Sequence, residues 1–163
     1  MTEPKSGRDC ENLLSIISEV TGRFVDIETF IKVCLFDSLI GNHDRHGRNL
    51  GFLVTSKGST LAPIYDNPSA LGLENGDWLK ADFSPKGRIT TKKSEEPTTK
   101  DYVIEFKRLG YLDQVLAFSK NINIIQINRL IDDSFCSPLM KAAYKNLIRK
   151  RTEEIQNELS KGP

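Results

Sequence analysis

The sequence predicts a mainly helical domain with one small β-hairpin near its centre. Apolar residues recur at helical spacing over most of the chain. Two short apolar runs between residues 50 and 65 instead flank a Ser-Lys-Gly turn, which is typical of a hairpin. A chain of 163 residues is long enough to bury one core and too short for two, so we expect a single domain over residues 1–163.

Composition argues against several classes of function. The 23 Lys and Arg residues balance 22 Asp and Glu residues, so a net charge of +1 indicates no overall attraction for nucleic acid or an acidic membrane. No segment approaches the roughly 20 apolar residues that span a bilayer, and residues 1–12 lack the apolar core of a signal peptide. The 3 cysteines include no CxxC pair, which predicts reduced thiols and a cytoplasmic location. Cys34 lies in an apolar run and should be a small core residue.

Two helices are expected before the hairpin. The first covers about residues 8–21, because apolar residues mark one of its faces and Gly22 is a natural stop. The second follows Asp26, a favourable N-cap residue, and is apolar nearly all round. That pattern predicts a buried central helix, which should end at Gly41.

The hairpin should pair residues 50–54 with residues 59–65 through a turn at residues 56–58. Proline has no amide hydrogen to donate, so Pro63 confines the second strand to a sheet edge or marks its end. After the hairpin, residues 67–98 are rich in Gly, Pro, Ser, Thr and Lys and lack periodicity. A loop of that length inside a compact domain is usually functional or partly disordered.

The C-terminal helices should occupy residues 99–160. Hydroxyl or amide side chains that can accept hydrogen bonds from helix N–H groups precede three of them. These candidate caps are Thr98 or Thr99, Asn121 or Asn123, and Ser137 before Pro138. The expected helices are 99–109, 112–119, 125–133 and 138–160.

Three polar side chains stand at the ends of the predicted hairpin. Asp44 and Asn49 precede its first strand, and Asp66 follows its second. Because a hairpin returns its second strand beside its first, all three can converge. Two carboxylates and an amide oxygen are the hard donors that Mg²⁺ prefers, with water and substrate phosphates as its other ligands. An Asp followed five residues later by an Asn is also the spacing of the kinase catalytic loop.

Two family patterns bear on this loop. Residues 36–50, Phe-Asp-Ser-Leu-Ile-Gly-Asn-His-Asp-Arg-His-Gly-Arg-Asn-Leu, resemble the catalytic-loop signature of HipA-like serine/threonine kinases, the toxin-type kinases of bacterial toxin–antitoxin systems. Residues 61–67, Leu-Ala-Pro-Ile-Tyr-Asp-Asn, resemble the second metal motif of the same family. The Asp-Arg-His-x-x-Asn core is similar, more distantly, to that of the phosphatidylinositol kinases. The resemblance is best over residues 26–73 and implies a protein-kinase-like C-lobe, the HipA-like C-terminal domain.

The resemblance also implies an activity and a set of roles. The chain would take part in Mg²⁺- and ATP-dependent phosphorylation of Ser or Thr in a protein substrate. Asp44 would act as the general base or orient the substrate hydroxyl. Asn49 and Asp66 would bind Mg²⁺ and, through it, the ATP phosphates. Arg45 and His46 would support the loop or neutralise charge near the transferred phosphoryl group.

These residues also allow two other interpretations. A single Asp or Asn between a helix and a strand commonly satisfies backbone groups instead, but the ordered set favours a metal site. Residues 41–44, Gly-Asn-His-Asp, also match an element of calcineurin-like metallophosphoesterases. Those enzymes need several histidines, and this sequence has 2, so that site cannot be completed.

The sequence departs from the kinase pattern before and after the catalytic loop. No glycine-rich phosphate loop and no Val-Ala-x-Lys-like lysine precede it, so we expect the N-lobe to be absent. His43 stands where eukaryotic-type kinases usually have Arg, and Asn67-Pro68 replaces the Phe-Gly that usually follows the metal-binding Asp.

Three explanations of the absent N-lobe stay open. The chain is a fragment of a longer kinase, a protein partner such as an N-lobe-bearing polypeptide or an antitoxin completes it, or catalysis has been lost. In the last case the chain would be a non-catalytic binding or regulatory module with a kinase fold.

Overall fold

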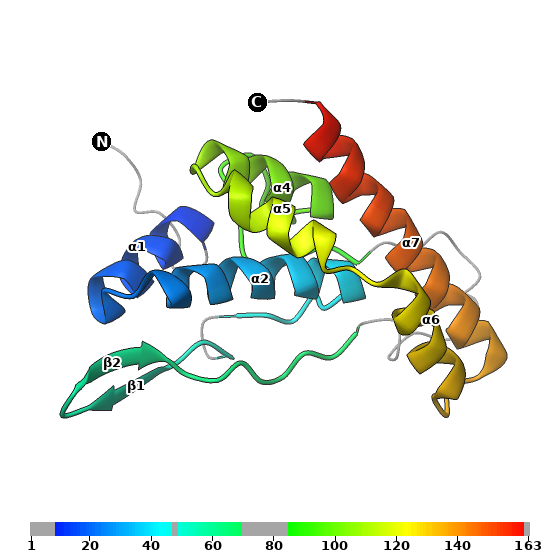
Figure 1. Cartoon of the computed structure of the whole chain (residues 1–163), viewed down its shortest axis with the longest axis horizontal. Helices are drawn as coiled ribbons and strands as arrows, with labels where there is room; N and C mark the ends of the chain where they lie inside the picture. The colour runs from blue at the N-terminus through cyan, green and yellow to red at the C-terminus, as the bar shows by residue number, and fades with distance from the viewer. Residues whose placement is uncertain (1–8, 47–48, 70–84, 162–163) are drawn as a thin grey trace.

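The chain folds around one long central helix. The computed structural model describes residues 9–46, 49–69 and 85–161. In Figure 1 helix α2 runs through the middle of the molecule, with the hairpin on one side and the C-terminal helices on the other. The first elements are α1 (Cys10–Thr21), α2 (Phe24–Ile40), β1 (Phe52–Thr55) and β2 (Gly58–Leu61). They are followed by α4 (Thr99–Arg108), α5 (Leu112–Lys120), α6 (Ile124–Asp133) and α7 (Pro138–Ser160). The prediction of a mainly helical domain with a central hairpin is confirmed.

Helix α2 begins earlier than the sequence predicted. Asp26 was expected to cap it, but the helix starts at Phe24, and the N-cap residue Arg23 makes no side-chain cap bond. Gly22 ends α1 in the left-handed conformation at φ 60°, which leaves one linking residue before the next helix. Asp26 therefore lies inside the first turn, where its negative charge is near the positive end of the helix dipole. The predicted end at Gly41 is confirmed, with φ 77°.

The hairpin is shorter and tighter than predicted. Phe52 pairs with Leu61 and Thr55 with Gly58, so residues 56–57 alone form the turn. Gly58, expected in the turn, is the first strand residue and has φ 124°, a conformation that side chains disfavour. The second strand ends before Pro63, as expected from its missing donor.

The C-terminal helices follow the sequence closely. Thr98 caps α4 in a capping box with Asp101, Asn123 caps α6, and Ser137 caps α7 ahead of a proline. The choices between Thr98 and Thr99 and between Asn121 and Asn123 are thereby decided. Of the predicted long loop, residues 70–84 lie outside the described residues; residues 85–98 run irregularly to α4.

The core lies where α2 meets the helices before and after it. Phe30, Leu35, Phe106 and Ile155 are fully buried, 0% exposed. Cys34 is also in this core, as predicted, and burial raises the pKa of its thiol well above the ordinary value, with a smaller contribution from Cys10. The thiol is therefore neutral and unsuited to nucleophilic attack. Within the described ranges, no helix is both long and apolar enough to cross a membrane.

Candidate functional site

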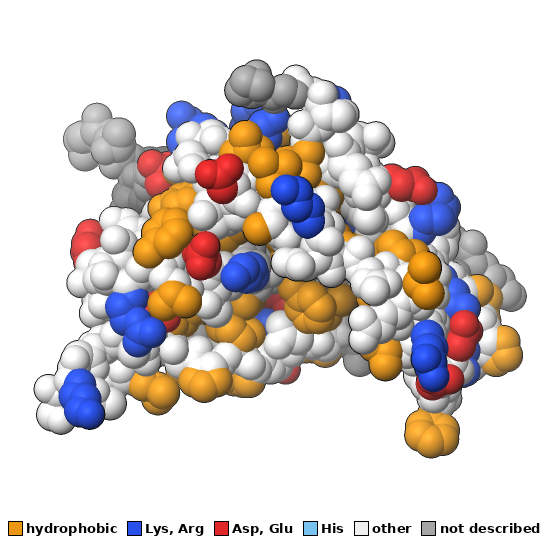
Figure 2. Space-filling view, viewed as in Figure 1, with side chains coloured by type: hydrophobic (Ala, Val, Ile, Leu, Met, Phe, Trp, Pro, Cys, Tyr) orange, Lys and Arg blue, Asp and Glu red, His pale blue; other side chains and the backbone are white. Residues whose placement is uncertain are grey.

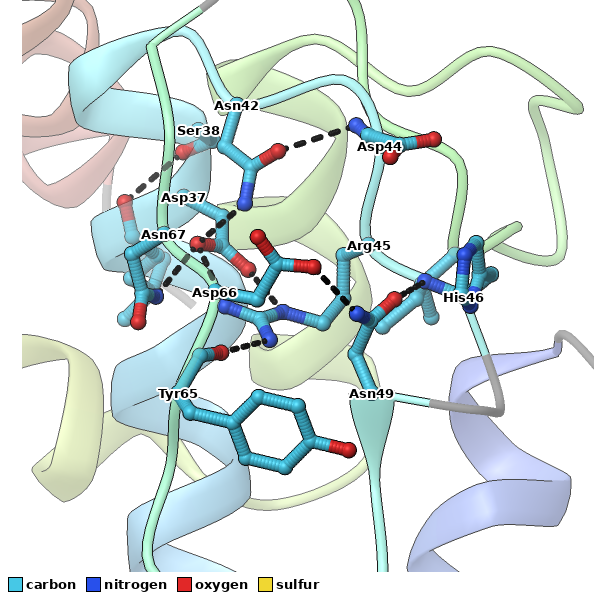
Figure 3. A network of polar contacts seen from close by, with 12 residues as sticks. Asp37, Ser38, Asn42, Asp44, Arg45, His46, Asn49, Tyr65, Asp66 and Asn67 are labelled. Atoms are coloured by element: carbon cyan, nitrogen blue, oxygen red, sulfur yellow. Dashed lines mark hydrogen bonds and ion pairs between the residues drawn. The ribbon is translucent and has the colours of Figure 1, made fainter.

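The loop after α2 turns back on itself directly after Gly41. The side chain of Asn42 is buried and donates from Nδ2 to Asp37 Oδ1 at 3.0 Å. Its Oδ1 accepts the backbone N–H of Asp44 at 2.9 Å, an Asx-type turn that sets the course of the loop. The Asp44 side chain is exposed, so its carboxylate is accessible to solvent. Figure 3 shows these residues together.

Two of the three predicted hairpin residues meet directly. Asn49 Nδ2 donates to Asp66 Oδ2 at 2.6 Å, although the two residues are 17 apart in the chain. Asn49 Oδ1 accepts the backbone N–H of His46 at 3.2 Å, which ties the amide to the backbone of the loop after α2. The hairpin therefore brings Asn49 and Asp66 together as expected from its geometry. Their role as metal ligands stays a prediction.

Asp66 has an unusual backbone conformation. Its φ is 58°, and among the described residues no other residue except glycine has a positive φ. Asp tolerates the left-handed region better than most residues, at a cost of about 1–2 kcal/mol. Such conformations cluster at functional sites, where the surrounding contacts impose them. The Asn49 contact is one such constraint.

Arg45 turns inward and away from solvent. Its side chain is 2% exposed, and Nε donates to Asp37 Oδ2 at 2.6 Å. Nη2 donates to Asp37 Oδ1 at 3.1 Å, and Nη1 donates to the carbonyl of Tyr65 at 2.7 Å. Of the two predicted roles, these contacts favour support of the loop over neutralisation of a phosphoryl group.

The two histidines of the loop after α2 have different surroundings. The carbonyl of His43 accepts a hydrogen bond from Arg88 Nε at 3.2 Å, which links the loop to residues 85–98. His46 is half-buried, and its Nδ1 atom is buried without a hydrogen-bond partner in the described part of the chain.

Sequence reasoning did not single out Asp37, which lies at the centre of the site. We call the residues bonded to it, with Asp37 itself, the Asp37 network: Asp37, Asn42, Arg45 and Asn67. A signal was present, because Asp37 is the one carboxylate in residues 30–40, which are otherwise mostly apolar. Such a residue is almost never buried unless it is paired.

The donor set fits Mg²⁺. Asp66 offers a solvent-exposed carboxylate. Asn49 places its Nδ2 beside that carboxylate, and its amide oxygen accepts the backbone N–H of His46. Among the described residues, no cluster of three or more His, Cys, Asp or Glu side chains could enclose a metal. Mg²⁺ commonly takes one or two protein oxygens and completes its shell with water and phosphates. The residues present suit a phosphate-bound Mg²⁺ and not a fully protein-enclosed metal.

A partly apolar groove adjoins the network. It has a volume of about 510 Å³ and is bounded by Asn67 and by side chains from α2, the segment after β2, and the end of α5. Its other lining residues are Thr29, Lys32, Val33, Phe36, Ile64, Phe118 and Asn121. Figure 2 shows apolar side chains gathered over α2 and along the hairpin edge of this face.

Known proteins resemble the chain over most of its length. The model of the HipA-like C-terminal domain family matches residues 2–150. The serine/threonine-protein kinase CtkA of Helicobacter pylori is 27% identical in an alignment 176 residues long. The alignment covers 95% of this chain and 53% of that protein. The crystal structure of the H. pylori proinflammatory kinase CtkA matches with a TM-score of 0.66 at 23% identity, over 96% of this chain and 62% of that one.

The chain belongs to the HipA-like C-terminal domain family. Its fold is that of the corresponding part of a solved kinase, which confirms the predicted kinase-like C-lobe. The chain spans about half the length of the curated relative, 53%. The activity, substrates and partners of a whole kinase are therefore proposals for this chain.

Proposed function

We propose that the chain is the catalytic-loop half of a serine/threonine protein kinase that uses Mg²⁺ and ATP to modify a protein substrate. The observation that carries the proposal is the hydrogen bond from Asn49 Nδ2 to Asp66 Oδ2. It joins the two residues that the family motif assigns to the metal. The loop just before it exposes the carboxylate of Asp44.

The chemistry needs few protein groups, because phosphoryl transfer depends on positioning and charge neutralisation. Asp44 would accept the proton of the substrate hydroxyl as that oxygen bonds to the γ-phosphorus. The bond from the γ-phosphorus to the β–γ bridging oxygen breaks, and ADP leaves with that oxygen. Asn49 and Asp66 would hold Mg²⁺, which when bound neutralises charge on the phosphates. Arg45 and His46 would hold the loop in shape.

A second polypeptide segment should complete the nucleotide site. We propose that it carries a glycine-rich strand and a lysine and covers the hairpin side of the molecule. Exposed apolar side chains support this: Leu53 and Val54 of β1 are 51% and 78% exposed, and Phe24 and Val25 of α2 are 57% and 50% exposed. Apolar groups gathered at a surface commonly mark protein interfaces.

The resemblance also suggests a partner and a compartment for the chain. The toxin-type kinases that the sequence resembles belong to toxin–antitoxin systems, so we propose that the completing partner is a protein in the cytoplasm, N-lobe-bearing or an antitoxin. Free thiols support a reducing compartment. The free cysteines are Cys10, Cys34 and Cys136.

Isosteric variants test the proposed roles. Asp44→Asn and Asp66→Asn remove one charge each and keep the side-chain shape. In the chain combined with a segment bearing an N-lobe, each should slow transfer of labelled γ-phosphate to protein by about 100-fold or more, because a base or a metal ligand is lost. The measurement is the initial rate at varied Mg²⁺ concentration.

Asp113→Asn is the matched control, since Asp113 is an exposed carboxylate in the first turn of α5. It should keep the wild-type rate. Wild-type rates in both site variants would overturn the assigned roles. Calorimetry with Mg²⁺-ATP that shows no binding by the completed protein would favour the non-catalytic binding module.

A further inference from the structure

Asp37 occupies a position that does not favour a carboxylate. It lies in the last turn of α2, where the carbonyl end of the helix dipole repels negative charge. It is also 4% exposed, so its charge is removed from water. Helix stability therefore does not account for an Asp at this position.

The contacts of Asp37 join two separate segments. Its Oδ1 accepts from Asn42 Nδ2 at 3.0 Å and from Arg45 Nη2 at 3.1 Å, both in the loop after α2. The same oxygen accepts from Asn67 Nδ2 at 2.9 Å, 30 residues further along the chain. Arg45 adds a link through Nη1 to the carbonyl of Tyr65 at 2.7 Å. One carboxylate thus connects the loop before the hairpin to the segment after it (Figure 3).

The network members flank the residues of the proposed active site. Asp44 lies between Asn42 and Arg45, which both bond to Asp37. Asp66 lies between Tyr65, whose carbonyl accepts from Arg45, and Asn67, which donates to Asp37. The backbones of Asp44 and Asp66 are therefore held through their sequence neighbours, which requires no direct contact between either residue and Asp37.

We infer that Asp37 is a positioning residue, which through Arg45 and Asn67 sets the placement of Asp66 relative to the catalytic loop. The inference rests on the proposed function for its catalytic consequence, but the coupling itself is a property of the fold. A buried ion pair can instead serve only the stability of the fold, in which case apolar side chains can replace it. The two roles predict different results.

Side-chain amide NMR of the full chain tests the coupling without any activity. Among the described residues, no hydrogen bond joins Asn49 to Asp37, yet Asn49 Nδ2 donates to Asp66. In wild type we expect the side-chain amide signals of Asn42, Asn49 and Asn67 to be protected from hydrogen exchange. Asp37→Asn should remove protection from all three, including Asn49. Unchanged protection of Asn49 would overturn the inference.

Asp26→Asn is the matched control for the loss of a buried carboxylate. Asp26 lies on the same helix and is 6% exposed, and its Oδ2 accepts no hydrogen bond within the described residues. This variant should leave the Asn49 signal as in wild type. Loss of Asn49 protection in the control would mean that any change in α2 disturbs the loops, which also overturns the inference.

A double variant separates positioning from stability. Asp37→Leu with Arg45→Met removes both charges and keeps comparable bulk, so urea unfolding should show much less destabilisation than Asp37→Asn alone. In the phosphotransfer assay kcat should stay about 10- to 100-fold below wild type with little change in KM for the protein substrate. If the double variant instead recovers both stability and kcat, the ion pair between Asp37 and Arg45 serves only the stability of the fold, and the inference is overturned.

Failure of the two proposals gives different patterns. If wild type shows no phosphotransfer while Asp37→Asn still removes the protection of the Asn49 amide from hydrogen exchange, the proposed function fails and the positioning role holds. If phosphotransfer needs Asp44 and Asp66, but substitution of Asp37 changes neither the protection of the Asn49 amide nor kcat, the proposed function holds and the positioning role fails.

Discussion

Individual residues around the site are in conformations and environments that cost free energy. Asp66 has a left-handed backbone, and Asp37 is a carboxylate buried next to Arg45. Removing one partner of a buried pair typically destabilises a protein by about 3–5 kcal/mol, because a charge is left without its counter-charge. That cost is a large share of the roughly 5–15 kcal/mol that stabilises a typical domain. Both residues are part of, or bonded to, the segments that carry the proposed chemistry.

Tyr102 gives a pH-dependent prediction at this scale. Burial, followed by the nearby thiols and Asp37, raises the pKa of its phenol well above the ordinary value of 10.0. The folded state then holds its proton where the unfolded chain releases it, so the free energy of unfolding should fall as the pH rises above about 10. Tyr102→Phe should flatten that fall, as measured by urea unfolding from pH 8 to 11. Parallel curves for both proteins would contradict the prediction.

At the scale of elements, the irregular segment of residues 85–98 is held against α4. Tyr102 donates from Oη to the carbonyl of Ile89 at 2.8 Å, and the backbone N–H of Gly87 donates to the carbonyl of Pro97 at 2.8 Å. Arg88 of this segment also donates a hydrogen bond to the carbonyl of His43, so the segment contacts the loop after α2. The segment is part of the support of the site.

Gly87→Ala should disrupt this attachment. A Cβ at position 87 would overlap the ring and hydroxyl of Tyr102, so the segment must shift. We expect a loss of about 1–3 kcal/mol in the free energy of unfolding, the usual cost of overpacking, measured by thermal or urea unfolding.

Gly51→Ala is the control for Gly87→Ala. Its Cβ would meet only Ala62 Cβ at 3.8 Å, an ordinary contact. This variant should differ from wild type by less than about 1 kcal/mol. Equal losses in the two variants would mean that the contact with Tyr102 does not set the effect.

On the scale of the whole molecule, α2 is the shared support of the other parts. It packs against α1, α4, α5 and α7, and its end leads directly into the loop that carries Asp44 and Asn49. The site is therefore only as stable as the packing of this helix. Loss of core contacts far from the loop should release the site together with the fold.

Phe30→Ala tests that dependence. Phe30 is 0% exposed in the middle of α2, and its truncation should cost about 3–5 kcal/mol in urea unfolding. Phe135→Ala is the control, since Phe135 is fully exposed at the α6–α7 junction, and it should change stability by less than about 0.5 kcal/mol. As urea is added, the side-chain amide signal of Asn49 should be lost in the same transition as the rest of the fold. A separate, earlier loss of that signal would contradict the view that the site and core unfold together.

Most elements of this protein could be predicted because their signals are local. Helical spacing, the cap residues Thr98 and Ser137, and the stop at Gly41 act within a few residues, so the helix positions followed from the sequence. The order of Asp44, Asn49 and Asp66 also indicated the family and a hairpin at whose ends all three could converge. Of these, the structure joins Asn49 and Asp66 by a hydrogen bond. The start of α2 and the length of the strands were less accurate, since neighbouring turns and Pro63 decide where hydrogen bonding begins and ends.

The Asp37 network was decided only by the tertiary structure. Which side chain accepts from Arg45, and whether Arg45 points at a phosphate or into the protein, depends on contacts between segments 8 to 30 residues apart. A buried carboxylate selects its partners by desolvation and geometry, and neither is encoded in local spacing. The sequence by itself determined the helices, the hairpin and the order of the site residues. The folded chain determined which of them meet, because burial makes the pairing of charged groups obligatory.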